Sequence, residues 1–225
     1  LKNGSKGAGY LVVSNFAAND EGVDFRDVAN KTYQEYDPEE AASYWEKAKE
    51  ELGTDSMSIT LLYDDTDELP TIVQFVQAGL PGLTVGLQAQ PTSKARRELM
   101  ASGDYDIALT RWGSDYNDPS TFMDLFKTDG SFNYGKYSNA EYDQLCTDAS
   151  GKDIMDTDTR FQEYIDAEGI LLFGHLPTQV PIEETPFFYE DQIQESTIQG
   201  THYLIYDIYT IQEEQGFWIR GVISK

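Results

Sequence analysis

Residues 57–112 read MSITLLYDDTDELPTIVQFVQAGLPGLTVGLQAQPTSKARRELMASGDYDIALTRW, and this stretch decides the fold. The expected elements are strands at 57–63, 83–89 and 105–112 and helices at 68–78 and 92–102. In the first two strands every second residue is apolar, which is typical of a strand with one buried face. The order strand, helix, strand, helix, strand predicts parallel βαβ units. We therefore expect a mixed α/β sheet with three parallel central strands and helices on both faces.

Helix signals lie before and within this stretch. Asp37 can cap a helix that has Pro38 in its first turn, and Gly53 can end it. A proline inside a helix removes a backbone hydrogen bond. Pro70 therefore weakens the helix at 68–78, which we expect to be short.

After the last of these strands the chain becomes helical. Asp118 and Pro119 begin one helix. Ser138 is the expected cap of the next helix, with Glu141 completing a capping box. A longer helix is expected at 157–173.

The two ends of the chain carry weaker patterns. Residues 1–36 are polar and glycine-rich, so we expect them to be extended or irregular. Residues 179–212 are β-rich by composition, with a terminal strand at 203–209, and 216–225 receive no assignment. No internal repeat or linker divides the sequence, so we expect a single α/β domain over 1–225.

Charge and composition exclude several classes of function. The chain has 225 residues, with 40 acidic against 16 basic ones and a net charge of -24. Such a surface repels nucleic acid and anionic lipid headgroups. Cys146 is the single cysteine, so the chain has no internal disulfide. No apolar run has the length of a membrane helix or of a signal peptide, so the protein is either intracellular or has its leader outside this chain.

The candidate site follows the third strand, because an open α/β sheet binds ligands beyond the carboxyl ends of its strands. The loop there reads Gly113-Ser114-Asp115-Tyr116-Asn117-Asp118-Pro119. Asp115, walled by Trp112 and Tyr116, could hold a cation such as an α-ammonium group. The simpler interpretations are that Asp115 is a solvated loop acid and that Asp118 is a helix cap.

Other residues that could carry chemistry have simpler explanations. The acidic stretch at 64–68 lacks the glycine and the spacing of a calcium loop, so it is interpreted as a solvated turn. His175 and His202 are isolated, and Cys146 lies on the apolar side of its helix. The sequence has no phosphate-binding loop, no dinucleotide fingerprint and no Gly-x-Ser-x-Gly motif.

At this loop the sequence resembles a known family. Residues 102–107 contain GDYD, and 112–124 read WGSDYNDPSTFMD. Both segments resemble the oligopeptide- and dipeptide-binding proteins of ABC importers, which carry GDYD followed by W-x-x-DY-x-DP-x-x-F. Further segments agree in the same order: NGS at 3–5, GYLV at 9–12, DFR at 24–26, YDPEEA at 36–41, LPGLTV at 80–85, YDQL at 142–145 and AEGIL at 167–171.

The resemblance implies the C-terminal lobe of a two-lobed receptor with a type II periplasmic-binding-protein-like fold. Such a receptor captures extracellular oligopeptides and delivers them to an ABC transporter permease, without catalysis, metal or cofactor. It would be extracytoplasmic, either periplasmic or a cell-surface lipoprotein. Its leader and first lobe would precede Leu1, with 1–36 close to the hinge and membrane contact only through the leader.

The resemblance also implies roles for individual residues. Asp115 matches the aspartate that pairs with the amino terminus of the ligand. Trp112, Gly113, Ser114 and Tyr116 are the expected neighbours of the peptide.

Other functions stay open. One alternative is a nickel- or sugar-binding member of the same scaffold, and another is a peptide-pheromone sensing or adhesion domain. A third alternative, from another class, is a secreted hydrolase that uses the carboxylates of Asp115 and Asp118.

Overall fold

The computed structural model describes residues 6–8, 10–30, 38–67, 69–79, 83–173, 201–206, 208–211 and 215–224. Its elements in chain order are β1 (Lys6–Ala8), α1 (Phe25–Ala29), α2 (Pro38–Leu52), β2 (Met57–Asp64), α3 (Leu69–Gly79), β3 (Leu83–Gln90), α4 (Ser93–Ser102), β4 (Ile107–Gly113), α5 (Ser120–Met123), the 3-10 turn η1 (Asp124–Phe126), α6 (Ala140–Ser150), α7 (Thr157–Phe173), β5 (Thr201–Tyr206), β6 (Ile208–Ile211) and β7 (Gln215–Ser224).

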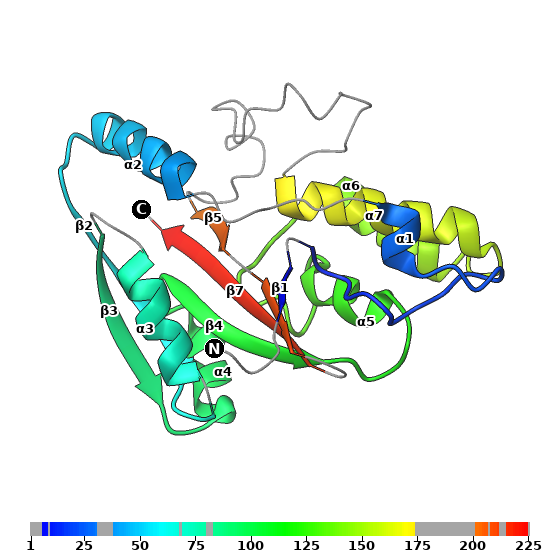
Figure 1. Ribbon diagram of the computed structural model, residues 1–225, viewed down its shortest axis with the longest axis horizontal. Helices are drawn as coiled ribbons and strands as arrows, with labels where there is room; N and C mark the ends of the chain where they lie inside the picture. The colour runs from blue at the N-terminus through cyan, green and yellow to red at the C-terminus, as the bar shows by residue number, and fades with distance from the viewer. Residues whose placement is uncertain are drawn as a thin grey trace.

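The strands form one mixed sheet in the order β1-β6-β7-β4-β2-β3, with β5 also paired to β7 (Figure 1). Strand β2 is parallel to β3 along its whole length and parallel to β4 at Leu61 and Leu62. The prediction that these three strands are parallel is therefore confirmed, but β3 lies at the edge of the sheet and not at its centre. All pairs that involve β6 and β7 are antiparallel, which makes the sheet mixed as expected.

Helices α3 and α4 cover opposite faces of the parallel strands, because successive side chains of a strand alternate between the faces. Ile59 and Leu61 pack with Ile72 of α3. Leu62, the next residue of β2, packs instead with Met100 of α4. The expected helices on both faces are therefore present.

The prediction that Pro70 weakens its helix is wrong. Pro70 is the second residue of α3, a helix of 11 residues. The first four N–H groups of a helix have no acceptor within it, so a proline there costs no hydrogen bond. Helix α4 ends as predicted at Gly103, which has a positive φ of 79°.

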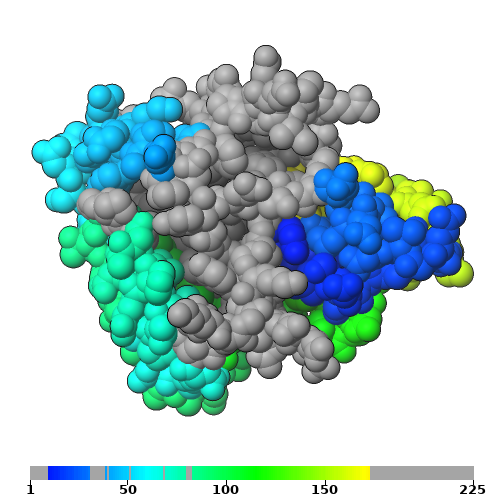
Figure 2. All heavy atoms as spheres, viewed as in Figure 1, coloured from blue at the N-terminus to red at the C-terminus, as the bar shows by residue number. Residues whose placement is uncertain are grey.

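A second body of helices, formed by α1, α5, α6 and α7, lies beside the sheet (Figure 1). Its core contains Phe25, Phe122, Tyr142, Cys146 and Phe161, all of them buried. Figure 2 shows the N-terminal segment with α1 against the side of α6 and α7, away from α2 and α3.

The cap of α6 is Asn139, not Ser138. The Asn139 side chain accepts the backbone N–H groups of Glu141 and Tyr142. The hydroxyl of Ser138 instead contacts that of Thr128, at 3.1 Å. Serine and asparagine are both favourable N-cap residues, so capping preferences alone cannot distinguish Ser138 from Asn139.

Both ends of the chain contain more order than the composition indicated. Residues 1–36, expected to be extended or irregular, include the short strand β1 and also the helix α1, which was not expected. Residues 215–224, which had no assignment, form β7, which lies antiparallel to β4. The predicted Asp37 cap and most of the β-rich region at 179–212 lie outside the described residues. The strand predicted at 203–209 is present as two strands, β5 and β6, and β7 follows them.

Candidate functional site

The carboxyl ends of β2, β3 and β4 lie at one edge of the sheet, because the strands are parallel. The loop 113–119 extends from this edge toward the helical body. The candidate residues are therefore placed where this class of sheet presents its ligands.

The carboxylate of Asp64, at the end of β2, is occupied by contacts within the protein. Its carboxylate is 2.5 Å from Nε of Arg96 and 3.6 Å from Nη2 of Arg111, and it accepts the hydroxyl of Thr66 at 2.6 Å. Burial alone would raise the pKa of Asp64, but these partners outweigh it and lower the pKa. The interpretation of this stretch as a solvated turn is wrong for Asp64, which is 1% exposed.

The carboxylate of Asp118 is also occupied by contacts within the protein. Nη2 of Arg160 is 2.7 Å from one of its oxygens and 2.6 Å from the other, and the N–H of Ser120 donates to it at 3.0 Å. The N-cap of α5 is Pro119 and not Asp118 as predicted, but the Asp118 side chain accepts the first N–H of the helix and ties the loop to α7. Burial acts to raise the pKa of Asp118, but Ser120 and Arg160 lower it overall. A carboxylate held ionised is a poor general acid, which weighs against a hydrolase that uses it.

Asp115 differs from both of these acids. Its backbone N–H donates to Oγ1 of Thr121 at 3.2 Å, which fixes the loop. Its side chain is exposed, and within the described part of the chain no cation pairs with the carboxylate. Tyr116 is 51% exposed and contacts Ser120 through its hydroxyl at 3.1 Å. Solvent therefore reaches Asp115, and the expected aromatic shielding is not formed by Tyr116 in this state.

Trp112 ends β4 beside the helical core and is partly buried. Its ring meets that of Phe132 edge to face, with centroids 4.7 Å apart and an interplanar angle of 66°. Gly113 is exposed and Ser114 half-buried. Trp112, Gly113, Ser114 and Asp115 are consecutive residues at the end of β4 and in the loop after it, and Phe132 from a distant loop packs against Trp112.

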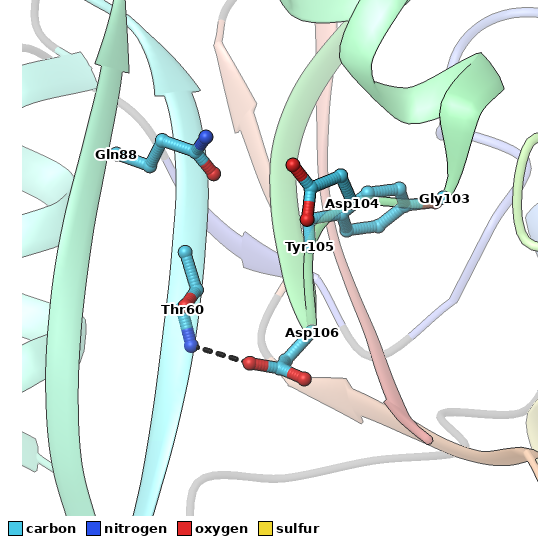
Figure 3. A pocket seen from close by; sticks show the side chains of 6 residues that line it. All are labelled: Thr60, Gln88, Gly103, Asp104, Tyr105 and Asp106. Carbon is cyan, nitrogen blue, oxygen red and sulfur yellow. Dashed lines mark hydrogen bonds between the residues drawn. The ribbon is translucent and has the colours of Figure 1, made fainter.

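A polar hollow of about 290 Å³ lies elsewhere, near the start of β4. Its lining residues are Thr60, Gln88, Gly103, Asp104, Tyr105 and Asp106 (Figure 3). The Asp106 carboxylate accepts the backbone N–H of Thr60 at 2.7 Å (Figure 3), which joins β2 to the chain just before β4 begins. The GDYD segment therefore aligns strands, and the candidate ligand site lies at the other end of β4.

Sequence reasoning missed the buried pair of Arg26 and Glu168. Oε1 of Glu168 accepts the backbone N–H groups of Leu11 and Val12 at 2.7 and 2.8 Å, and Oε2 is 2.6 Å from Nη2 of Arg26. This contact fastens the N-terminal segment and α1 to α7. The signal was present, since both charged residues belong to segments that carry the family resemblance.

The described residues include no group of three or more histidine, cysteine or acidic side chains that could hold a metal ion. Burial raises the pKa of Cys146 to about 12, so its thiol is a core group and a poor nucleophile. His175 lies outside the described residues. No helix in the described ranges combines the length and the apolar character needed to span a membrane.

Comparisons with known proteins agree with this architecture. The family model described as bacterial extracellular solute-binding proteins, family 5 Middle, matches residues 1–134. A dipeptide-binding protein from Lactococcus lactis subsp. cremoris is 33% identical over 193 residues, which is 83% of this chain and 34% of that protein.

Solved structures show the same fold. The substrate-binding domain of an oligopeptide ABC transporter from Bacillus anthracis gives a TM-score of 0.72 at 29% identity, covering 97% of this chain and 37% of that chain. Listeria monocytogenes OppA bound to peptide gives a TM-score of 0.64 at 36% identity, covering 76% of this chain and 32% of that chain. The chain thus spans about a third of the length of these relatives.

Proposed function

Since the chain belongs to the bacterial extracellular solute-binding proteins of family 5, we propose that it is the C-terminal lobe of a receptor that captures oligopeptides and delivers them to the permease of an ABC importer. Its fold is that of a lobe of the type II periplasmic-binding-protein-like class. Its family binds substrates for transport and acts outside the cytoplasm. The proposal includes a first lobe, because the relatives are much longer than this chain. The full protein would be either a lipid-anchored protein of the cell surface or a periplasmic protein without an anchor.

The observation that carries the proposal is that the Asp115 carboxylate is exposed and has no ion pair with any residue that the structure describes. Three other acids near this edge, Asp64, Asp67 and Asp118, each have an arginine partner. The carboxylate of Asp115, just after a parallel strand, has no cation partner among the described residues. A peptide's α-ammonium group is its natural partner, since charge-assisted hydrogen bonds are roughly twice as strong as neutral ones.

The closing of a second lobe would make this pair effective. An exposed ion pair contributes about 0–1 kcal/mol, because water competes for both charges. A lobe that covers the peptide removes that water and satisfies the main-chain groups of the ligand. Trp112 and Tyr116 would then supply the apolar surroundings that Asp115 lacks in the open lobe.

The test compares Asp115→Asn with the wild type in the full-length receptor. Calorimetry should show that a free-amine oligopeptide binds the variant more weakly by roughly 2–4 kcal/mol, the scale for breaking a desolvated charge pair. The N-acetylated peptide should bind the wild type poorly and lose little more in the variant. Asp20→Asn, which changes an exposed acid in a remote turn, is the matched control.

Two results would overturn the proposal. Equal affinity of the wild type and Asp115→Asn for the free-amine peptide would reduce Asp115 to a loop acid. Failure of the full-length receptor to bind any peptide would refute peptide capture itself. Sugar, nickel, adhesion and pheromone-sensing roles stay predictions, and no contact in the described residues favours them over peptide capture.

A further inference from the structure

We infer that Phe132 is a specificity-determining residue, which forms with Trp112 an apolar wall beside Asp115 and selects peptides with an apolar side chain at one of their first two positions. This inference rests on the proposed function, because it takes Asp115 as the contact of the peptide amino terminus. It adds the chemical class of ligand that this lobe prefers.

Phe132 belongs to the site because of its contact with Trp112. The two rings meet edge to face with centroids 4.7 Å apart. Trp112 is the last but one residue of β4, and Asp115 lies three residues further on, in the loop that follows the strand. Residue 132 is therefore placed at the carboxyl edge of the sheet by packing, although it is distant from that loop in sequence.

The turn that carries Phe132 is held in place from within. The next residue, Asn133, is 8% exposed, and its Nδ2 donates to the carbonyl of Lys127 at 3.1 Å and to that of Tyr137 at 2.6 Å. Its Oδ1 accepts the backbone N–H of Tyr137 at 3.0 Å. The backbone N–H of Thr128 donates to the Asp143 carboxylate of α6 at 2.9 Å. Phe132 is thus presented on a fixed backbone, which lowers the entropy lost when a ligand binds.

Phe132 is exposed although the two residues that follow it are not. Its exposed fraction is 46%, whereas Asn133 is buried and Tyr134 packs against the core under α4. Among the described side chains only three aromatic ones are exposed, namely Phe75, Tyr116 and Phe132. Of these three, Tyr116 belongs to the loop that holds Asp115, and Phe132 contacts Trp112 just before that loop. Exposed aromatic side chains gathered at one place are typical of a binding surface.

The surface formed by Phe132 and Trp112 is apolar. Nε1 of Trp112 is buried and has no acceptor within the described part of the chain. The Asp115 carboxylate, three residues after Trp112, attracts the peptide amino group and repels an acidic side chain. An aliphatic or aromatic side chain next to the amino terminus therefore fits this corner, and glutamate does not.

The experiment measures binding of tetrapeptides to the full-length receptor by calorimetry. The peptides are tetra-alanine and its variants with leucine, phenylalanine or glutamate at position 1 or position 2. The wild type should bind leucine or phenylalanine at one of these positions about 10-fold more tightly than alanine, the scale of small changes in an apolar pocket. Glutamate there should bind more weakly than alanine.

The variants then assign this preference to Phe132. Phe132→Ala should remove the preference while changing the affinity for tetra-alanine by less than about 2-fold, because the backbone contacts stay intact. Phe132→Leu should retain most of the preference, since it keeps an apolar wall. Phe75→Ala removes another exposed phenylalanine, 76% exposed on α3, and should change nothing.

Each outcome decides between the two proposals. A preference that survives Phe132→Ala, or equal binding of all peptides by the wild type, overturns the role of Phe132 and leaves peptide capture standing. A loss of affinity in Phe132→Ala that is the same for every peptide also overturns it, because that pattern indicates a structural role. Absence of any peptide binding overturns peptide capture and the inference together.

Discussion

The buried contact of Glu168 gives a prediction that can be worked out from distances. Glu168 lies in α7 and is 0% exposed, and its carboxylate serves three donors: the N–H groups of Leu11 and Val12 and the guanidinium of Arg26. Glu168→Gln keeps the shape of the side chain and one oxygen. That oxygen can still accept both backbone N–H groups, so the variant removes mainly the pairing with Arg26.

The magnitude follows from the burial of Arg26, whose side chain is 7% exposed. The variant places an amide NH₂ group against the guanidinium, which leaves a buried cation without an anion. Breaking such a pair costs about 3–5 kcal/mol, out of a total stability of about 5–15 kcal/mol for a typical domain. The Tyr10 and Phe25 rings, each 4.7 Å from the guanidinium carbon, soften this loss only in part.

The assay is urea unfolding followed by tryptophan fluorescence, for Glu168→Gln, Arg26→Met and the double variant. The double variant should be more stable than the sum of the two losses predicts, with a coupling energy above about 2 kcal/mol, because it leaves no buried charge unpaired. Glu98→Gln is the matched control. Its carboxylate is 68% exposed and 3.8 Å from Lys94, so it should cost less than about 0.5 kcal/mol. Additive losses, or a loss below about 1 kcal/mol for Glu168→Gln, would refute this reasoning.

Three further predictions concern stability. Burial and the neighbouring Asp153 carboxylate, which accepts a hydrogen bond from protonated Glu163, raise the pKa of Glu163 to about 7. The folded state therefore binds this proton more tightly than the unfolded chain, whose glutamate pKa is about 4.3. The melting temperature should therefore rise as the pH falls from about 7 toward 4.3, and Glu163→Gln should flatten that rise; an unchanged slope in the variant would contradict the assignment. Added NaCl at pH 7 should raise the melting temperature, since it screens the net charge of -24, and a steady fall with salt would argue against it. Asn139→Ala should lower the unfolding free energy, measured by urea titration, by about 1 kcal/mol, and Ser138→Ala should lower it by clearly less. The reverse order would indicate that Ser138 is the cap.

The helices and the parallel strands could be predicted because their signals are local. Alternation in 57–63 and 83–89 follows from the pleat of a strand with one buried face. The predicted strands and helices of this region agree with β2, α3, β3, α4 and β4 to within two residues at each end. The order of these elements then leaves a parallel arrangement as the natural one, because a crossover helix connects each pair of strands.

The long-range contacts could not be predicted, since they join residues that have no periodic relation. Arg26 and Glu168 are 142 residues apart, Asp118 and Arg160 are 42 apart, and Asp64 and Arg96 are 32 apart. The position of β7 could not be predicted for the same reason. It pairs with β4, which is one of the two outer strands of the parallel group, and the sequence does not indicate which of the two it joins. Composition can mark a segment as β-forming, but it does not choose the partner strand.

For the candidate site, the sequence by itself determined the position of the loop and the residue types in it, because both follow from the end of a strand and from the family pattern at 112–119. Only the tertiary structure separated Asp115 from Asp118. Folding brings Arg160 of α7 against Asp118 and leaves Asp115 exposed without a cation among the described residues. The physical reason is that a carboxylate's availability depends on which cations reach it through space, and the sequence order of two acids in one loop does not contain that information.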